Sequence, residues 1–456
     1  MTGIFPPAVA APGQRRKPKP TRRSRPVAKE IVQVPTRTLQ IPPSLEALVQ
    51  PPQTGVPDPA LPPVPAARPQ LVRKRLVVED PYAQLGIRSG GMAFLPWIEQ
   101  DVGYDSNPNR TQASQGSKML RTEGGVRIQS DWLTHELTGE LRGAYNLYPD
   151  VQGADRPEGT GRLGLRIDAT RDTAINLETR YQIDTQRPGS PELNVAVRDR
   201  PIFGTYGAAA GVTQRFNRLE VTLRGTIDHT FYEDARLTNG TTLSQADREF
   251  TQYGAQLRVA YELTPGVKPF VEGRADTRVY DQSIDSAGYR RSSDAVGARL
   301  GTTFEFTRML TGELAAGYQR RRYDDPRLKD LQGPLVDAAL VWAATPLTTV
   351  RLKGQTSLDE STIPGASGAL TRRATLEVQH DLRRNVSLLG SVTAGTTDYR
   401  GIALREDFYG AGVKLDYRLT RWLALRGSVT YERLNSSSPG ADYRATTYLV
   451  GLRLQP

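Results

Sequence analysis

Apolar and polar residues alternate along long segments of this chain, beginning near Ala93. Between Leu219 and Phe231 the odd positions are mostly apolar and the even positions mostly polar, as in Leu219, Val221, Leu223 and Ile227 against Glu220, Thr222, Arg224 and Asp228. Successive side chains of a β-strand point to opposite faces, so this pattern predicts strands with one apolar and one polar face. The mean hydropathy is −0.49, and no apolar run approaches the roughly 18 residues of a membrane-spanning helix. A helical membrane protein is therefore excluded, but a membrane β-barrel is not, because its strands alternate lipid-facing and lumen-facing residues.

The alternating segments predict an all-β fold, an antiparallel transmembrane β-barrel of about eighteen strands. Strands are expected near residues 93–104, 118–131, 134–147, 160–170, 173–184, 204–216, 218–232, 248–262, 267–281, 292–307, 309–323, 332–344, 347–359, 370–382, 385–399, 404–419, 421–434 and 442–455. These segments exceed the usual globular strand of about 5–6 residues and suit a tilted crossing of a bilayer. The alternative is a large soluble β-sandwich, solenoid or propeller, which would have shorter strands or a fixed repeat. We detect no such repeat, and the sequence favours the membrane barrel.

The connections between these segments fall into two alternating classes. Nine are longer and polar, and eight are tight: Leu133, Arg171-Asp172, Asn217, Thr264-Pro265-Gly266, Arg308, Thr345-Pro346, Arg383-Arg384 and Thr420. Outer-membrane barrels alternate short periplasmic turns with long external loops and keep both termini on the periplasmic side. The longer connections 105–117, 185–203 and 233–247 are candidates for narrowing a pore, and they fit ordinary surface loops equally well.

The aromatic residues predict two membrane-interface belts, because Trp and Tyr prefer the interface between lipid and water. Trp97, Trp132, Trp342 and Trp422 fall at strand ends on the side of the short turns. The opposite strand ends carry a second group, namely Tyr104, Tyr148, Tyr232, Tyr280, Tyr323 and Tyr399.

Residues 1–80 differ in composition from the rest of the chain. They hold 17 of the 33 prolines and the basic run Gln14–Arg25. Such a segment buries too little apolar surface to fold, so we predict a disordered periplasmic tail before a barrel domain at 81–456. Met1–Ala11 ends in the small-x-small pattern Ala8-Val9-Ala10, and we hypothesise a signal-peptide remnant whose start codon lies upstream. The basic tail predicts contact with peptidoglycan or another anionic envelope polymer, and no nucleic-acid-binding module is recognisable.

The residues available for catalysis are few. The chain has no cysteine and three histidines, His135, His229 and His380. His229 and His380 share the parity of the apolar positions and would face lipid. No G-x-S-x-G or similar nucleophile motif is present. We predict no enzyme, no cofactor and no metal site, and the alternative is an outer-membrane hydrolase that depends on these histidines.

The polar face of the predicted strands carries charges of both signs in nearly equal number. The candidate lumen charges are Arg166, Arg180, Arg224, Arg258, Arg274, Arg299, Arg351, Lys353, Glu178, Glu220, Asp228, Glu272, Glu305 and Glu377. Separate acidic and basic ladders would create a transverse field and tune ion selectivity. Pairs across neighbouring strands would instead stabilise the barrel wall. Parity without register leaves both interpretations open.

Several hairpin segments resemble a known family. They are EQDVGYDSNPNR from Glu99, TQRFNRLEVTL from Thr213, FEFTRMLTGELAAGYQRRRYDDPRLKDLQGP from Phe304, WAATPLTTVRL from Trp342, TIPGASGALTR from Thr362 and GAGVKLDYRLTRWLALRGSVTYERLNSSSPGADYR from Gly410. Over residues 93–455 the chain resembles the outer-membrane β-barrel porins of the beta-barrel porin 2 type of Gram-negative bacteria. The resemblance implies an outer-membrane barrel that is a channel or accompanies envelope polysaccharide production, and it supplies no catalytic residues.

The sequence thus predicts a porin-like channel of the bacterial outer membrane for small polar solutes, because barrels of about 16–18 strands leave an aqueous lumen. The alternative is a structural or polysaccharide-export-associated barrel with a plugged or gated lumen, whose tail contacts envelope polymers. The expected partners are outer-membrane lipid and lipopolysaccharide, the barrel-assembly machinery and the envelope polymer. Gln319–Arg322 is a candidate contact for lipopolysaccharide phosphates, or a solvated rim.

Overall fold

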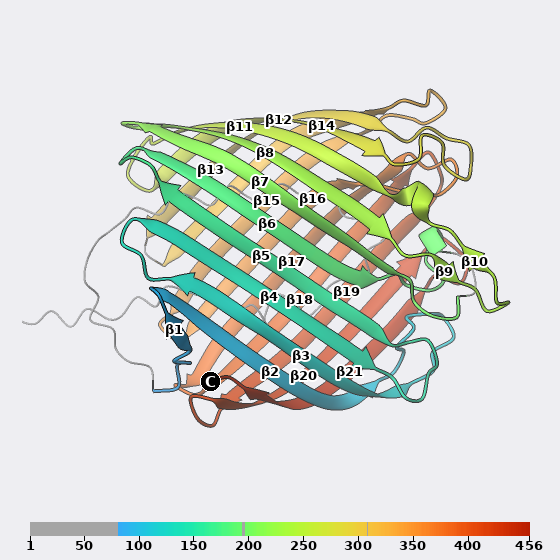
Figure 1. The fold of residues 1–456 in the computed structure, drawn as a ribbon, viewed down its shortest axis with the longest axis horizontal. Coiled ribbons are helices and arrows are strands. Elements are labelled where there is room, and N and C mark those ends of the chain that lie inside the picture. Colours follow the sequence, from blue (N-terminus) through green and yellow to red (C-terminus); the bar gives the residue numbers. More distant parts are fainter. Residues whose placement is uncertain (1–80, 194–196, 308) are drawn as a thin grey trace, which may run out of the picture. The chain divides into compact units, whose positions relative to one another are not determined.

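The structure, a computed structural model, describes residues 81–193, 197–307 and 309–456. Within these residues, eighteen long antiparallel strands form one closed barrel (Figure 1). The strands are β2 (Met92–Asp105), β3 (Ser117–Ser130), β4 (His135–Leu147), β5 (Arg156–Asp168), β6 (Thr173–Thr185), β7 (Ile202–Phe216), β8 (Leu219–Tyr232), β11 (Phe250–Tyr261), β12 (Val267–Tyr280), β13 (Ser293–Thr307), β14 (Leu310–Tyr323), β15 (Leu331–Thr345), β16 (Thr348–Asp359), β17 (Gly368–Arg383), β18 (Val386–Arg400), β19 (Arg405–Arg418), β20 (Leu423–Ser436) and β21 (Tyr443–Leu454). Each strand pairs with the next one along the chain, and β21 pairs with β2 to close the sheet. No helix in the described ranges is long and apolar enough to span a membrane.

The alternation in the sequence sets the two faces of the barrel. On β8, Leu223 is exposed on the outer face, and Arg224 and Asp228 are buried on the inner face. The register keeps like faces together, since Leu223 lies opposite Leu257 of β11 and Arg224 lies opposite Gln256. Large apolar side chains are therefore exposed outside and polar side chains are buried inside, the reverse of a water-soluble protein.

The predicted number, order and approximate bounds of the strands are confirmed. Short turns lie at one end of the barrel and long connections at the other (Figure 1). The β7–β8 turn is the dipeptide Asn217-Arg218, in which Asn217 has a φ of 55°, a backbone conformation that two-residue hairpins favour. The predictions for Arg308 and for the tail 1–80, including its signal-peptide remnant, lie outside the described residues.

The barrel also carries short strands and 3-10 turns that the sequence pattern did not predict. β1 (Ile87–Ser89) pairs with the first residues of β2, and β9 (Ala235–Arg236) pairs with β10 (Thr242–Leu243) in the β8–β11 connection. Single 3-10 turns lie at Pro191–Leu193 (η2) and Ala246–Arg248 (η3). Elements of two or three residues are too short to carry a periodic signal.

The tryptophan belt needs one correction. Trp132, Trp342 and Trp422 are exposed at or near the short turns. The prediction that Trp97 belongs to this belt is wrong, because its side chain lies on the inner face and is 5% exposed. The guanidinium of Arg453 lies 4.1 Å from the centre of the Trp97 ring, and this cation–π contact holds the indole inside the barrel.

The tyrosine belt at the opposite end is also largely wrong. Tyr104 is exposed on the outer face, but Tyr148, Tyr232, Tyr280 and Tyr399 are buried at inner-face positions. The half-buried Tyr323 donates its hydroxyl hydrogen to the carbonyl of Ser367. These rings pack inside because they share the parity of the inner-face residues on their strands, and arginines cover some of them, as Arg248 covers Tyr232 at 4.1 Å.

Candidate functional site

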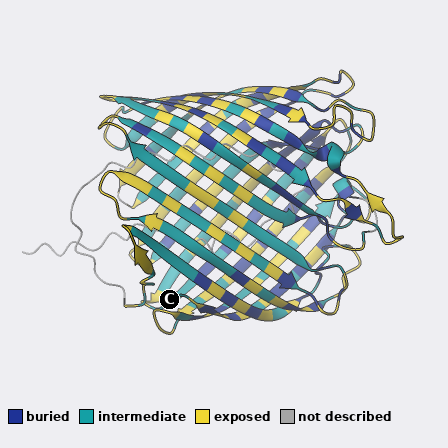
Figure 2. Ribbon diagram, in the orientation of Figure 1, coloured by how far each residue is buried: buried dark blue, intermediate teal, exposed yellow. Residues whose placement is uncertain are grey.

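The lumen differs between the two ends of the barrel. Figure 2 shows buried residues gathering toward the strand ends that carry the long connections. There the inner-face side chains are at most 5% exposed at positions such as Asp105, Asn146, Tyr280, Arg321 and Ala295. Nearer the short turns, inner-face positions such as Glu136, Glu305 and Lys353 are exposed. We call these two regions the loop half and the turn half of the lumen.

Oppositely charged side chains on the inner face meet across the strands. Arg180 of β6 forms an ion pair with Asp228 of β8, although β7 lies between them. Gly207 of β7 makes this possible, because a Cβ at that position would lie 1.9 Å from Asp228 Oδ1. Arg299 of β13 and Asp337 of β15 also approach to 2.5 Å across β14, where the small residues Gly317 and Ala315 lie opposite them. Inner-face glycines are therefore the sequence signal that could have predicted pairing across three strands.

Most of the other candidate lumen charges also have partners. The pairs are Arg166 with Asp168, Arg224 with Glu178, Arg258 and Arg299 with Glu272, Glu220 with Arg215, and Arg351 with Glu377, and Arg274 donates to the amide oxygen of Gln319. In the described part of the chain, the exposed side chains of Lys353 and Glu305 form no ion pair. The structure thus brings most opposite charges together instead of separating them into two ladders.

At the loop end of the barrel, the β16–β17 hairpin separates from β15 but stays paired with β18. β15 pairs with β16 only as far as Asp337 and Gln355, whereas β16 stays paired with β17 up to Asp359. Leu358 and Leu370 of the freed end pack against Leu331 of β15, and all three side chains are fully buried. The hairpin end therefore folds against the inner surface.

Polar contacts join this hairpin end to distant strands. Glu360 forms an ion pair with Arg278 of β12. Arg291, in the β12–β13 connection, donates hydrogen bonds to the carbonyls of Ser361 at 2.7 Å and Ala366 at 3.1 Å. Sequence analysis missed these residues. Leu358 keeps the parity of the outward-facing Leu352, and the only local irregularity is the apolar pair Ala369-Leu370.

The β6–β7 connection reaches toward the same hairpin from the other side of the barrel. We call its described residues, 186–193 and 197–201, the crossing segment. Arg187 donates to the carbonyl of Ala441 at 2.9 Å, and Arg200 donates to the carbonyl of Pro108 at 2.8 Å. The segment therefore touches both the β20–β21 and the β2–β3 connections.

Glu192 in the 3-10 turn η2 connects the crossing segment to the β16–β17 connection. Its carboxylate accepts hydrogen bonds from the hydroxyls of Ser361 at 2.6 Å and Thr362 at 3.0 Å. Arg248 of the β8–β11 connection approaches the same carboxylate at 3.7 Å. In the strand order, the β6–β7 and β16–β17 connections lie on nearly opposite sides of the barrel, so these contacts span the loop end of the lumen.

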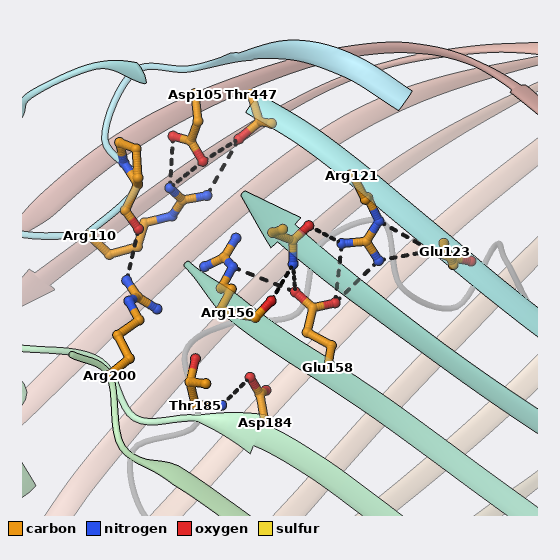
Figure 3. A network of polar contacts seen from close by, with 12 residues as sticks. Asp105, Arg110, Arg121, Glu123, Arg156, Glu158, Asp184, Thr185, Arg200 and Thr447 are labelled. Atoms are coloured by element: carbon orange, nitrogen blue, oxygen red, sulfur yellow. Dashed lines mark hydrogen bonds and ion pairs between the residues drawn. The ribbon is translucent and has the colours of Figure 1, made fainter. Parts of the chain in front are cut away.

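A polar cavity of about 270 Å³ lies between the crossing segment and the barrel wall. Figure 3 shows part of its charged lining, in which Arg121 bridges Glu123 at 2.8 Å and Glu158 at 3.2 Å. Arg110 binds Asp105 at 2.7 Å and also Glu432 at 2.9 Å. Basic and acidic side chains both line this space, so it suits a small polar solute better than an apolar one.

Arg110 and Arg200 have contrasting electrostatic surroundings within this lining. Burial lowers the pKa of the Arg110 guanidinium, but Glu432 and Asp105 more than offset it and raise that pKa above its ordinary value. Burial lowers the pKa of Arg200 to about 9, and the neighbouring Arg156 cation acts in the same direction. Arg200 is 7% exposed and forms no ion pair within the described ranges. It keeps its charge at neutral pH without a carboxylate partner.

The histidines lie away from the cavity. His135 is exposed near the short turns. His229 and His380 lie on the outer face, where each Nδ1 shares a hydrogen bond with a threonine, Thr251 at 3.0 Å and Thr348 at 2.9 Å. None of the three lines the cavity.

The comparison with protein families agrees with the barrel geometry. A family model described as "Putative beta-barrel porin 2" matches residues 80–456. No curated protein matches the sequence. Similar solved structures include OccAB4 of Acinetobacter baumannii (11% identity, TM-score 0.41, 81% of this chain and 99% of that chain), OccK2 (OpdF) of Pseudomonas aeruginosa (11%, 0.40, 80% and 98%) and the copper transporter OprC (10%, 0.44, 81% and 81%).

Proposed function

Because the chain belongs to the family described as putative beta-barrel porin 2, we propose that it is a gated channel for small polar solutes. The protein is a porin-like barrel of the bacterial outer membrane. The observation that carries the proposal is the crossing segment, whose Glu192 is anchored on Ser361 and Thr362 of the far hairpin. In this proposal the loop half closes the lumen at rest, and release of Glu192 opens it.

The chemistry of the lumen supports passage of polar solutes. The cavity under the crossing segment is lined by paired charges such as Arg110 with Glu432 and Arg121 with Glu158. The turn half adds the exposed charges of Lys353 and Glu305. A solute with hydrogen-bonding groups can exchange partners along such a wall, whereas an apolar solute would leave these groups unpaired.

Single-channel recording in a planar bilayer tests the proposal. The full chain is compared with Glu192→Ala, which removes two hydroxyl hydrogen bonds and an ion pair that we expect to be worth about 1 kcal/mol each. The probability of the open state should rise about tenfold or more. Glu305→Ala is the matched control, because this exposed glutamate forms no ion pair in the described chain, and its open probability should equal that of the wild type.

The outcomes separate the channel from the gate. If the wild type and Glu192→Ala show the same conductance and open probability, the protein is a channel but the proposed gate is refuted. Silence of both proteins, with insertion demonstrated, would refute the channel.

A structural or polysaccharide-export-associated barrel with a closed lumen is the second candidate. The observation that favours it is the dense packing of the loop half, where Leu331, Leu358 and Leu370 are fully buried. Silence of the inserted protein in the recordings would support this candidate.

We also propose that the protein is not an enzyme. The three histidines lie outside the cavity lining, so the residues best suited to act as bases at neutral pH are remote from a solute in the lumen. Replacing His135, His229 and His380 by alanine should leave transport unchanged, and loss of a hydrolytic activity in that triple variant would contradict the proposal.

The partners of the barrel are proposals as well. Arg320 and Arg322 are exposed on the outer face of β14, near Asp330 at the long-loop end, and we propose that they contact lipopolysaccharide phosphates. Gln319 and Arg321 of the same run are buried on the inner face and take no part. We further propose that the barrel-assembly machinery inserts the protein and that the basic tail contacts peptidoglycan or another anionic envelope polymer.

A further inference from the structure

Three metal-ligating side chains meet on the outer face of the barrel, away from the lumen. They are His229 of β8, Glu249 directly before β11 and Asp281 directly after β12, and their ligand atoms all lie within 4.8 Å of one another. The register brings them together, because β11 lies between β8 and β12, and Asp281 donates its backbone N–H to the carbonyl of Glu249 at 3.0 Å. All three lie at the long-loop end of their strands.

The two carboxylates of this cluster lack a compensating cation. Glu249 accepts a hydrogen bond from the backbone N–H of Tyr232 at 3.1 Å, and neither Glu249 nor Asp281 forms an ion pair within residues 81–193, 197–307 and 309–456. The nearest basic residue in sequence, Arg248, turns inward to Glu192 and the Tyr232 ring. Two carboxylates held this close repel each other, and a bound cation would remove the repulsion.

His229 decides which cation fits. When Nδ1 donates its hydrogen to Thr251 Oγ1, at 3.0 Å, the lone pair of the imidazole is on Nε2. A hydrogen bond to the second ring nitrogen is the usual support of a metal-bound histidine. Imidazole together with carboxylates suits Zn²⁺ and its neighbours in the first transition row, whereas Ca²⁺ and Mg²⁺ prefer oxygen ligands alone.

We propose that His229, Glu249 and Asp281 bind a divalent transition-metal ion of the Zn²⁺ class at the external rim of the barrel. Ligand distances near 2.0–2.2 Å are typical of zinc sites, so small side-chain movements would close the present spacing of 4.8 Å. Three protein ligands leave at least one position open to water or an anion. The bound ion would join the loop ends of β8, β11 and β12.

Calorimetric titration of the purified full chain with ZnCl₂ in detergent tests the proposal. One high-affinity site per chain is expected, with the affinity reduced at least tenfold in His229→Ala and in Asp281→Asn. His380→Ala is the matched control, because His380 is another outer-face histidine hydrogen-bonded to a threonine, and it should bind Zn²⁺ like the wild type. Unchanged binding by His229→Ala, or equal loss in His380→Ala, would overturn the proposal.

Three further measurements keep the result interpretable. Displacement of Zn²⁺ by equimolar Ca²⁺ would indicate a site of carboxylates alone and would also overturn it. The visible absorption spectrum of the Co²⁺-loaded protein should lose intensity in His229→Ala but not in His380→Ala. Heat-modifiable mobility on gels shows whether each variant is folded, so that loss of binding is read only in intact barrels.

Discussion

The loop half and the turn half of the lumen are built from the same alternating strands, yet they differ in what their inner faces can do. In the loop half, Arg278 and Arg321 are fully buried and bound to carboxylates. In the turn half, Lys353 and Glu305 are exposed and form no ion pair in the described residues. The difference arises from the connections, because only the long ones fold back into the barrel.

The two halves of the lumen are therefore expected to have different roles. A charge that is buried and paired has a fixed partner and contributes little field to a passing ion, but its pairing holds the connections together. An exposed, unpaired charge stabilises nothing and acts on whatever passes. We therefore expect the loop half to determine stability and gating, and the turn half to determine ion selectivity.

The largest expected effect comes from removing a buried, doubly paired cation. Arg110→Met leaves the buried Asp105 and the half-buried Glu432 without their partner, so the free energy of unfolding should fall by about 3–5 kcal/mol. Arg200→Met is the matched control in the same cavity, because Arg200 has no carboxylate partner among the described residues. Its loss should cost about 1 kcal/mol or less.

Reversible urea unfolding in lipid vesicles measures both variants. A cost for Arg200→Met as large as that for Arg110→Met would mean that buried charges in the loop half stabilise the barrel regardless of pairing. The pH dependence adds a check. Because the pKa of Arg200 is lowered to about 9 in the folded protein, its charge disfavours folding at neutral pH, and this penalty should fade as the pH rises through 9.

The next effect concerns the apolar packing of the inward-folded hairpin. Leu370→Ala removes a fully buried side chain from the cluster with Leu331 and Leu358, and should cost about 2–4 kcal/mol. Leu376 on the same strand is 44% exposed on the outer face, so Leu376→Ala should cost clearly less. Equal costs for the two variants would mean that the hairpin end is not packed against the wall.

The barrel could be predicted from the sequence because its determinants are local. Alternation along Leu219–Tyr232, for example, fixes both the strand and the face on which Arg224 lies. The inner-face position of Trp97 could also have been predicted, since Trp97 has the same strand parity as Glu99 and Asp101. The belt prediction failed there because it used the position along the strand and ignored the face.

The contacts across the loop half could not be predicted, because they join residues far apart in the chain. Glu192 and Thr362 are held together by a hydrogen bond, but nothing in the sequence around either residue predicts this contact. The pairing of lumen charges could be predicted in part. Arg180 and Asp228 had the right parity, and only the register and the small size of Gly207 determine that they meet.

The smallest expected effect tests the turn half. Lys353 is exposed on the inner face of β16, between Ala339 and Thr375 of the neighbouring strands. Lys353→Glu should leave the free energy of unfolding within about 0.5 kcal/mol, because no ion pair is lost and the surroundings are wet. The reversal potential under a salt gradient should shift toward cations by roughly a twofold change in permeability ratio.

Lys353→Arg keeps the charge and should leave the reversal potential where it is in the wild type. The recordings are best made in the Glu192→Ala background, in which the loop half is released, so that the turn half alone filters ions. If Lys353→Glu left selectivity unchanged there, the paired charges of the loop half would have to control it even when open. The division of work between the two halves would then be refuted, although both could still belong to a channel.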